Sequence, residues 1–128
     1  MRVLIADDQR GVGVTLAALV ESCGHEVLQV VGSGFEAIQS YTRLAPDVVL
    51  MDFSMPRLNG ATACRMILSK DPDAKIVIIT ATPIAAEQAD TGAVAVLRKP
   101  VDIETLNRAL HAAVGRPAEP PRLEQDDS

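Results

Sequence analysis

The sequence predicts an α/β fold in which a parallel five-stranded sheet carries helices on both of its faces. Two observations lead to this prediction. Short apolar runs alternate along the chain with longer segments whose apolar residues recur at helical spacing, which is typical of a doubly wound sheet. The runs are also apolar at nearly every position, as expected for parallel strands that are buried on both faces.

The predicted strands are short segments rich in aliphatic residues. They cover residues 2–6, 26–31, 47–51, 75–80 and 93–97. The segment 75–80 gives the clearest prediction, because nearly all of its residues are β-branched and favour an extended backbone. The segment 47–51 ends abruptly in Asp52, and the loop that follows contains Asn59-Gly60, which is typical of a turn.

Helices are predicted in the intervening segments, so that each strand is followed by a helix in a (βα)5 arrangement. They cover about 11–23, 34–44, 61–70, 84–90 and 103–114. Gly24 stands where a left-handed C-terminal cap of the first helix belongs. Ser33 and Glu36 form a capping box before the second helix, and Asp102 can cap the last. The second helix is expected to turn a set of apolar side chains inward: Phe35, Ile38, Tyr41 and Leu44.

Length and composition fit a single globular domain of the cytoplasm. The chain has 128 residues, 48% of them hydrophobic, and its apolar runs are too short for a membrane span or a secretory signal,. Residues 1–115 form the predicted domain, and the Pro-rich, acidic segment 116–128 is predicted to be a disordered tail or a linker,. A net charge of −5 and an aromatic content of 2% argue against direct binding to nucleic acid,.

The cysteines, the histidines and one arginine are expected to have no part in a functional site. Cys23 and Cys64 lie within helical apolar patterns, which indicates buried, reduced thiols,. His25 and His111 have no ligand residues near them in the sequence and are expected to be structural or solvent-facing. Arg98 precedes Lys99, and because neighbouring residues of a strand point to opposite faces, its side chain is expected to face solvent.

Five polar or charged residues stand at the ends of predicted strands: Asp7, Asp8, Asp52, Thr80 and Lys99. Because parallel strands place their carboxyl ends along one edge of the sheet, these residues should converge. Three carboxylates in one crevice repel one another, and oxygen ligands favour Mg²⁺ as the cation that offsets the repulsion. Together with a lysine and a hydroxyl they form a site for a phosphoryl group, in which an Asp can act as nucleophile. The sequence has no Gly-rich phosphate loop, so a bound nucleotide is not indicated.

An ordered series of motifs extends this interpretation: the Asp7-Asp8 pair, Asp52 followed by Met55-Pro56 and Gly60, Thr80-Ala81, Gly92-Ala93 and Lys99-Pro100. In these motifs the chain resembles response-regulator receiver domains, the phosphoacceptor half of bacterial two-component signalling. The resemblance covers about residues 1–115 and implies a flavodoxin-like strand order of 2-1-3-4-5. It also implies a signalling domain rather than an enzyme, one that catalyses at most its own phosphorylation and dephosphorylation.

The resemblance assigns a role to each residue of the acidic crevice. Asp52 would take the phosphoryl group from a sensor histidine kinase, a phosphotransfer protein or a small donor, and Lys99 would pair with the phosphoryl oxygens. Asp8 and Asp52 would bind Mg²⁺ together with the backbone carbonyl of Ser54, whereas Asp7 would act at least partly through water. Phosphorylation would alter contacts with a downstream protein target, and homodimer formation is left open.

The switch and output side of the chain departs from the pattern of these domains. Thr80 would swing to hydrogen-bond the phosphoryl group, and the small Ala81 would leave it room. Val96 stands where these domains usually carry Tyr or Phe, and Val101 stands where an aromatic is common. The interval from Thr80 to Gly92 is about one helical turn shorter than usual. We therefore expect phosphoryl chemistry to be retained and signal read-out to be unorthodox.

Two other functions are compatible with parts of the pattern. A phosphatase of the haloacid-dehalogenase type also combines a nucleophilic Asp with a Thr or Ser, a Lys and acidic Mg²⁺ ligands. Such phosphatases carry a second Asp two residues after the nucleophile, where this chain has Ser54, and the nucleophile usually precedes the extra acids, whereas Asp7 and Asp8 come first. A receiver-like scaffold that works without phosphate is conceivable because Val96 lacks a ring, and its partner binding would be indifferent to Mg²⁺ and phosphodonor.

Overall fold

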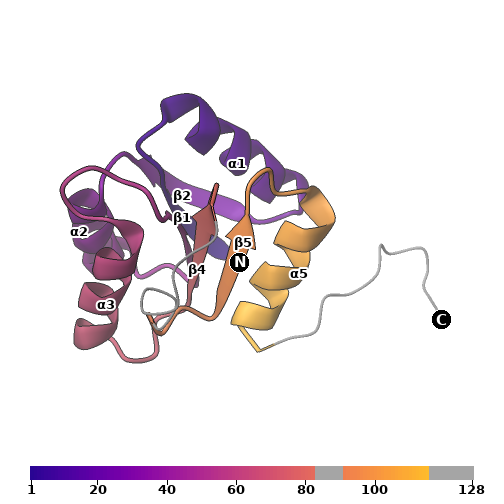
Figure 1. Ribbon diagram of the computed structural model, residues 1–128. Coiled ribbons are helices and arrows are strands. Elements are labelled where there is room, and N and C mark those ends of the chain that lie inside the picture. Colours follow the sequence, from indigo (N-terminus) through magenta and orange to yellow (C-terminus); the bar gives the residue numbers. More distant parts are fainter. Residues whose placement is uncertain (83–90, 116–128) are drawn as a thin grey trace.

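One parallel sheet of five strands organises the computed structural model, which describes residues 1–82 and 91–115 (Figure 1). The strands are β1 (Arg2–Ala6), β2 (Glu26–Val31), β3 (Val48–Asp52), β4 (Ile76–Thr80) and β5 (Ala95–Arg98). They pair in parallel in the order β2-β1-β3-β4-β5. This arrangement confirms the predicted parallel sheet and its flavodoxin-like order.

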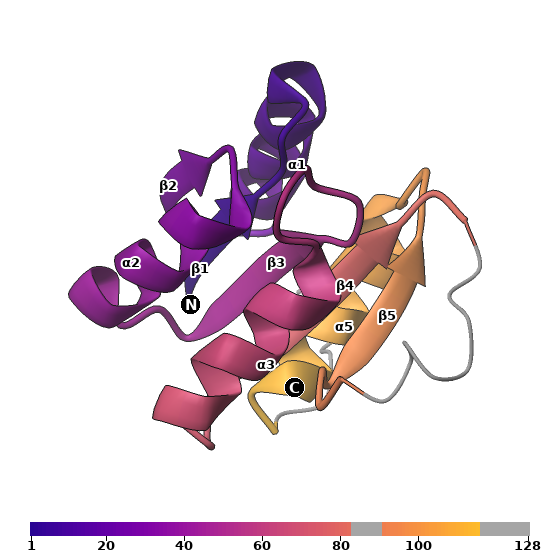
Figure 2. The same cartoon turned by 60° about the vertical axis from the view of Figure 1, so that its left-hand side comes forward.

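Helices cover both faces of the sheet. Those in the described residues are α1 (Arg10–Ser22), α2 (Gly34–Leu44), α3 (Gly60–Lys70) and α5 (Ile103–Ala113). Figure 2 shows α2 and α3 on one face, and α1 and α5 pack on the other. The helix predicted at 84–90 and the tail predicted at 116–128 lie outside the described residues.

Alternate side chains of the central strands enter two separate core layers, as the two-residue period of a strand requires. The layer toward α2 and α3 includes Leu4, Met51, Ile78, Ile38 and Ile67. The layer toward α1 and α5 includes Ile5, Leu50, Ile79, Leu16 and Leu106. Every residue of β3 and of β4 is buried, which explains why these segments are apolar at almost every position.

The ends of β3 and β5 differ from their predicted positions by one or two residues. β3 begins at Val48, one residue later than predicted, and includes Asp52 as its last residue. The sheet continues past it, because the Phe53 N–H donates to the Ile79 carbonyl at 2.8 Å. β5 starts at Ala95 rather than at residue 93. Asp52 is therefore part of the hydrogen-bonded sheet rather than of the loop that follows it, and this fixes the position of its backbone.

The predicted caps of α1, α2 and α5 are present. Gly24 follows α1 with a φ of +85°, a left-handed conformation that glycine adopts without strain. Ser33 Oγ accepts a hydrogen bond from the Glu36 N–H at 3.1 Å. The Glu36 carboxylate accepts one at 2.8 Å from the N–H of Gly32 rather than from that of Ser33, so the capping box closes one residue earlier. Asp102 caps α5 through its side chain.

The prediction that Phe35 faces inward is wrong. Its side chain is 51% exposed, while Ile38 of the same helix is buried. Gly34 occupies the inward position at the start of α2, where a Cβ would lie 2.9 Å from the carbonyl oxygen of Leu58. The loop after β3 approaches this turn so closely that only a glycine fits at the inward position, and the ring of Phe35 lies outside.

The two cysteines are free thiols with different exposure. Cys64 is fully buried, as predicted, whereas Cys23 is only partly buried. Burial raises the pKa of both thiols, which keeps them protonated and poorly reactive. The described ranges contain no helix that is long and apolar enough to cross a membrane.

His25 and His111 meet at the edge of the sheet where the strands begin. Their rings are T-shaped with centroids 5.5 Å apart. His25 Nδ1 lies 3.2 Å from the Met1 amino group, and Nε2 lies 3.3 Å from Asn107 Oδ1. Because a carbonyl oxygen can only accept, Nε2 carries the hydrogen and Nδ1 accepts from the amino group. Tertiary structure thus brings together two histidines that are far apart in the sequence, and these contacts agree with the structural role expected for them.

Acidification should destabilise the fold through His25. Burial is the main cause that holds the pKa of His25 below 6.5, the hydrogen bond to Asn107 opposes it, and the charges of the Met1 amino group and His111 add to it. The stability that neutral His25 contributes is complete above about pH 6.5 and is lost as the pH falls from there through the lowered folded-state pKa. We expect the thermal midpoint to drop between about pH 7 and pH 5.5, and His25→Gln to shrink that drop. An equal drop in both proteins would contradict this role.

Candidate functional site

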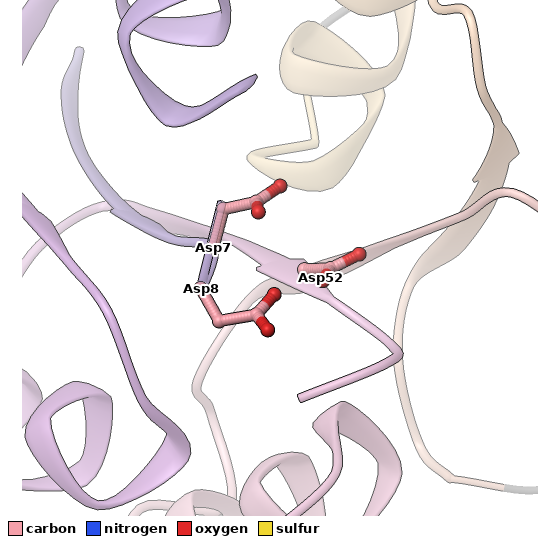
Figure 3. A group of neighbouring side chains, drawn as sticks. All are labelled: Asp7, Asp8 and Asp52. Carbon is pink, nitrogen blue, oxygen red and sulfur yellow. The ribbon is translucent and has the colours of Figure 1, made fainter. Parts of the chain in front are cut away.

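Three carboxylates converge where β1 and β3 end. Asp7 and Asp8 follow β1, Asp52 closes β3, and the two strands are neighbours whose pairing aligns Ala6 with Met51. One carboxylate oxygen from each of the three aspartates lies within 4.8 Å of the others. Figure 3 shows the three side chains reaching from these strand ends toward a common space. A set of oxygen ligands at this spacing fits a hard divalent cation such as Mg²⁺.

Lys99 supplies a positive charge to the same site. Its Nζ lies 3.0 Å from Asp52 Oδ1 and 3.3 Å from Asp7 Oδ2. The Lys99 N–H donates to the Thr80 carbonyl at 2.8 Å, so the pairing of β4 with the chain after β5 holds the lysine at the carboxyl edge. One ammonium against three carboxylates leaves the site with an excess of negative charge, which a bound cation would offset.

Burial and neighbouring charges shift the pKa values of Asp52 and Lys99. Desolvation is the main cause that raises the pKa of Asp52; the hydrogen bond from Lys99 opposes it, and the negative charges of Asp7 and Asp8 add to it. Burial alone would lower the pKa of Lys99, but hydrogen bonds and charge from Asp52 and Asp7 outweigh it, so that this pKa is raised. Lys99 therefore stays protonated, and the ionised form of Asp52 gains from any further cation.

The two neighbouring aspartates differ in what they can still bind. Asp7 is buried, and both of its oxygens accept hydrogen bonds: Oδ1 from the Gln9 N–H at 2.8 Å and Oδ2 from Lys99. Asp8 is exposed. Together they line an open hollow of about 530 Å³ with residues of α1, the end of β2 and the start of α2. Asp8 and the second oxygen of Asp52 are thus better placed than Asp7 to bind a cation directly.

Thr80 lies at the same edge, and its hydroxyl is hydrogen-bonded to the backbone of the loop that follows. The residue is buried at the end of β4, and its Oγ1 donates to the Thr82 carbonyl at 2.8 Å. The Thr82 N–H in turn donates to Thr80 Oγ1 at 3.2 Å. Ala81 and Ser54 are exposed beside the site. Thr80 is therefore held by its own loop and would have to break that contact to reach a group on Asp52.

Two backbone features support the site that the sequence did not single out for this purpose. The Gln9 N–H fixes Asp7, as described above. Gly60 begins α3 and donates its N–H to the Phe53 carbonyl at 2.7 Å. A Cβ on Gly60 would overlap the carbonyl oxygen of Asp52 and lie 2.9 Å from the Phe53 Cα. In the sequence this glycine stands in the Asn59-Gly60 turn and in the motif that begins at Asp52.

The residues that depart from the expected switch pattern lie on the β5 side. Val96 is 43% exposed on β5, and Arg98 is exposed as predicted. Val101 is half-buried and lines, with Pro100 and Lys99, an apolar hollow of about 650 Å³ against α1. This larger hollow contains no carboxylate, whereas Asp7 and Asp8 line the smaller one, and Asp52 lines neither.

Comparison with known proteins agrees with this geometry. The family model for the response regulator receiver domain matches residues 3–111. Chemotaxis protein CheY of Thermotoga maritima is 40% identical over 80 residues, which cover 62% of this chain and 67% of CheY. Transcriptional regulatory protein PdtaR of Mycobacterium tuberculosis is 38% identical over 118 residues, which cover 90% of this chain and 57% of PdtaR. The chain thus spans little more than half the length of PdtaR.

Solved structures of the same kind superimpose closely. A response regulator receiver domain protein from Clostridium thermocellum has a TM-score of 0.82 at 30% identity, with 88% of this chain and 93% of that chain covered. The receiver domain of a sensor histidine kinase from Pseudomonas aeruginosa has a TM-score of 0.81 at 27% identity, with 89% and 97% covered. The latter structure has a magnesium ion coordinated in its active site cleft.

Proposed function

Because the chain belongs to the family of response regulator receiver domains, signalling domains of two-component systems, we propose that it accepts a phosphoryl group on Asp52. The observation that carries the proposal is the contact of Lys99 Nζ with Asp52 at 3.0 Å beside two further aspartates. A buried carboxylate with a fixed cation and a set of cation ligands is equipped to act as a nucleophile toward phosphorus.

The transfer forms one bond and breaks one. An Asp52 oxygen attacks the phosphorus of the donor, and the bond between phosphorus and the donor's nitrogen or oxygen breaks, with its electron pair leaving on the donor. Lys99 neutralises charge on the phosphoryl oxygens as they approach. Asp8, Asp52 and the Ser54 carbonyl would hold Mg²⁺, and Asp7 would reach it through water because Lys99 and the Gln9 N–H already occupy its oxygens. When bound, Mg²⁺ supplies charge stabilisation to the transferring group.

The new phosphate would act on Thr80. A phosphoryl group adds nearly two negative charges and three strong acceptor oxygens, which compete with the Thr82 carbonyl for the Thr80 hydroxyl. Ala81 leaves room for the group. Because Val96 has no ring to follow Thr80 inward, read-out would depend on the loop after β4 and on the exposed face of β5 rather than on an aromatic switch.

The donor and the target of this switch are proteins in our proposal. A sensor histidine kinase or a phosphotransfer protein supplies the phosphoryl group, and a downstream protein recognises the altered surface. Homodimer formation is one form that this recognition can take. Direct contact with nucleic acid is not part of the proposal, because the chain carries a net charge of −5,.

Mass spectrometry of the intact protein tests the proposal. After incubation with acetyl phosphate and Mg²⁺ we expect a gain of one phosphoryl group per chain, and removal of Mg²⁺ with a chelator should reduce the gain to background. An unmodified protein that is folded and binds Mg²⁺ would favour the phosphate-independent scaffold. Sustained release of phosphate from an external phosphomonoester would favour the phosphatase.

A further inference from the structure

Arg10 is an exposed cation on the rim of the acidic crevice. It is the first residue of α1 and lines the hollow of about 530 Å³ together with Asp7, Asp8 and Glu36. We propose that Arg10 binds the leaving group of a small phosphodonor and thereby makes the chain prefer acyl phosphates, whose leaving group is a carboxylate. This inference rests on the proposed transfer to Asp52 and assigns a class of donor to it.

The position of Arg10 is unfavourable for the helix that contains it. The N-terminal end of a helix carries a partial positive charge, which disfavours a cation in the first turn. The first turn of α1 contains no acidic residue that would offset the charge of Arg10. Helix stability therefore does not account for an arginine here, and local preferences of this kind are commonly broken at functional sites. The carboxylates that line the same hollow give a reason for a cation at this position.

Within residues 1–82 and 91–115, no ion pair occupies the guanidinium of Arg10. Both ion pairs between the described side chains are made by Lys99. Asp7 accepts hydrogen bonds from Lys99 and from a backbone N–H, and Glu36 accepts one from a backbone N–H of the preceding turn. Two of the three carboxylates of the hollow thus have partners of their own, and the N–H donors of Arg10 remain available for a ligand.

The hollow that Arg10 lines adjoins the place where the transfer would occur. One oxygen of Asp8, which lines the same hollow, lies within 4.8 Å of one oxygen of Asp52 (Figure 3). Lys99 contacts Asp52 at 3.0 Å and would take up the phosphoryl oxygens. In an in-line transfer the leaving group lies opposite the attacking oxygen and points away from Asp52, toward the open part of the crevice. Arg10 has the longest side chain of those that line the hollow, so its guanidinium can reach the departing group from there.

The chemistry of the leaving group decides whether a cation assists its departure. When Asp52 attacks an acyl phosphate, a bond from its oxygen to phosphorus forms. The bond between phosphorus and the acyl oxygen breaks with its electron pair on that oxygen, so a carboxylate departs. An arginine binds a carboxylate through two parallel hydrogen bonds. In phosphoramidate the pair stays on a nitrogen that already carries its protons and departs as neutral ammonia, which a guanidinium does not stabilise. Arg10 should therefore accelerate transfer from the acyl phosphate alone.

Rates of phosphorylation by acetyl phosphate and by phosphoramidate, measured by intact mass at the same Mg²⁺ concentration, test this role. We expect Arg10→Gln to lower the rate with acetyl phosphate by about fivefold or more and to keep the rate with phosphoramidate within about twofold of the wild type. Arg10→Lys keeps the charge and should recover part of the loss. Arg65→Gln removes the same charge from an exposed position on α3 and should keep both rates within about twofold,.

The ratio of the two rates is the deciding quantity, because both donors react at Asp52 and the ratio does not depend on how much of a variant is folded. An unchanged ratio in Arg10→Gln would overturn the role of Arg10, and so would an equal change of the ratio in Arg65→Gln. Phosphorylation of the wild type by either donor would leave the proposed function standing in both cases. No gain of a phosphoryl group by the folded wild type from either donor would contradict the proposed function, and with it this role.

Discussion

Asp52→Asn is expected to abolish phosphoryl incorporation from acetyl phosphate, with at least a hundredfold loss of rate. The amide has nearly the shape of the carboxylate but carries no nucleophilic charge, and it cannot form a stable acyl phosphate. The side chain is 5% exposed at the end of β3, and Asp7, the other carboxylate that Lys99 contacts, is already held by the Gln9 N–H. Intact mass after incubation with Mg²⁺ and acetyl phosphate measures the loss.

The same substitution should stabilise the fold in Mg²⁺-free buffer. Burial raises the pKa of Asp52, so at neutral pH the folded state holds a charge that it disfavours. A neutral amide removes that cost and the repulsion from Asp7, while Lys99 keeps Asp7 as a partner. We expect a higher thermal midpoint for the variant without Mg²⁺ and a smaller gain when Mg²⁺ is added.

Asp73→Asn provides the matched control. It removes the same charge from an exposed turn between α3 and β4, so it should leave both phosphorylation and the response to Mg²⁺ unchanged. Phosphorylation that persists in Asp52→Asn at the wild-type rate would disprove the assignment of the phosphoacceptor. Loss in both variants would instead indicate a general effect of charge.

The place of the site could be predicted because its residues stand at strand ends. An apolar run ends where the chain leaves the sheet, and parallel topology brings such ends to one edge. Asp7 and Lys99, which are far apart in the sequence, therefore meet at 3.3 Å as the residue pattern implies. The pattern could not tell which of Asp7 and Asp8 is buried, because neighbouring residues after a strand turn to opposite sides and either order is compatible with the same topology.

Features that depend on close contact or on distant pairing could not be predicted. Helical spacing places Phe35 inward because hydrophobicity ranks it above Gly34, but the core at that turn has space only for a hydrogen. The contact of His25 with His111 joins a turn to the last helix, and no local spacing connects them. Both features depend on how closely two elements approach each other in the fold, and the spacing of apolar residues within one element carries no information about that distance.

Gly60→Ala is expected to destabilise the fold by about 2–3 kcal/mol and to slow phosphorylation of Asp52, because overpacking at this position cannot relax cheaply. The added methyl would overlap the Asp52 carbonyl and crowd the Phe53 backbone. These atoms belong to the strand that holds the phosphoacceptor, so relief of the clash must move either β3 or the start of α3. Urea unfolding gives the loss of stability, and intact mass gives the rate.

Gly11→Ala makes the same chemical change without the contact. Gly11 also lies in the first turn of its helix, and a Cβ there meets nothing within 4 Å. Alanine should raise the free energy of unfolding by up to about 1 kcal/mol, because it favours the helix and reduces the freedom of the unfolded chain. Opposite signs for the two substitutions would show that the fit of Gly60 against Asp52, rather than helix propensity, holds the site in place. A stabilising or neutral Gly60→Ala would refute it.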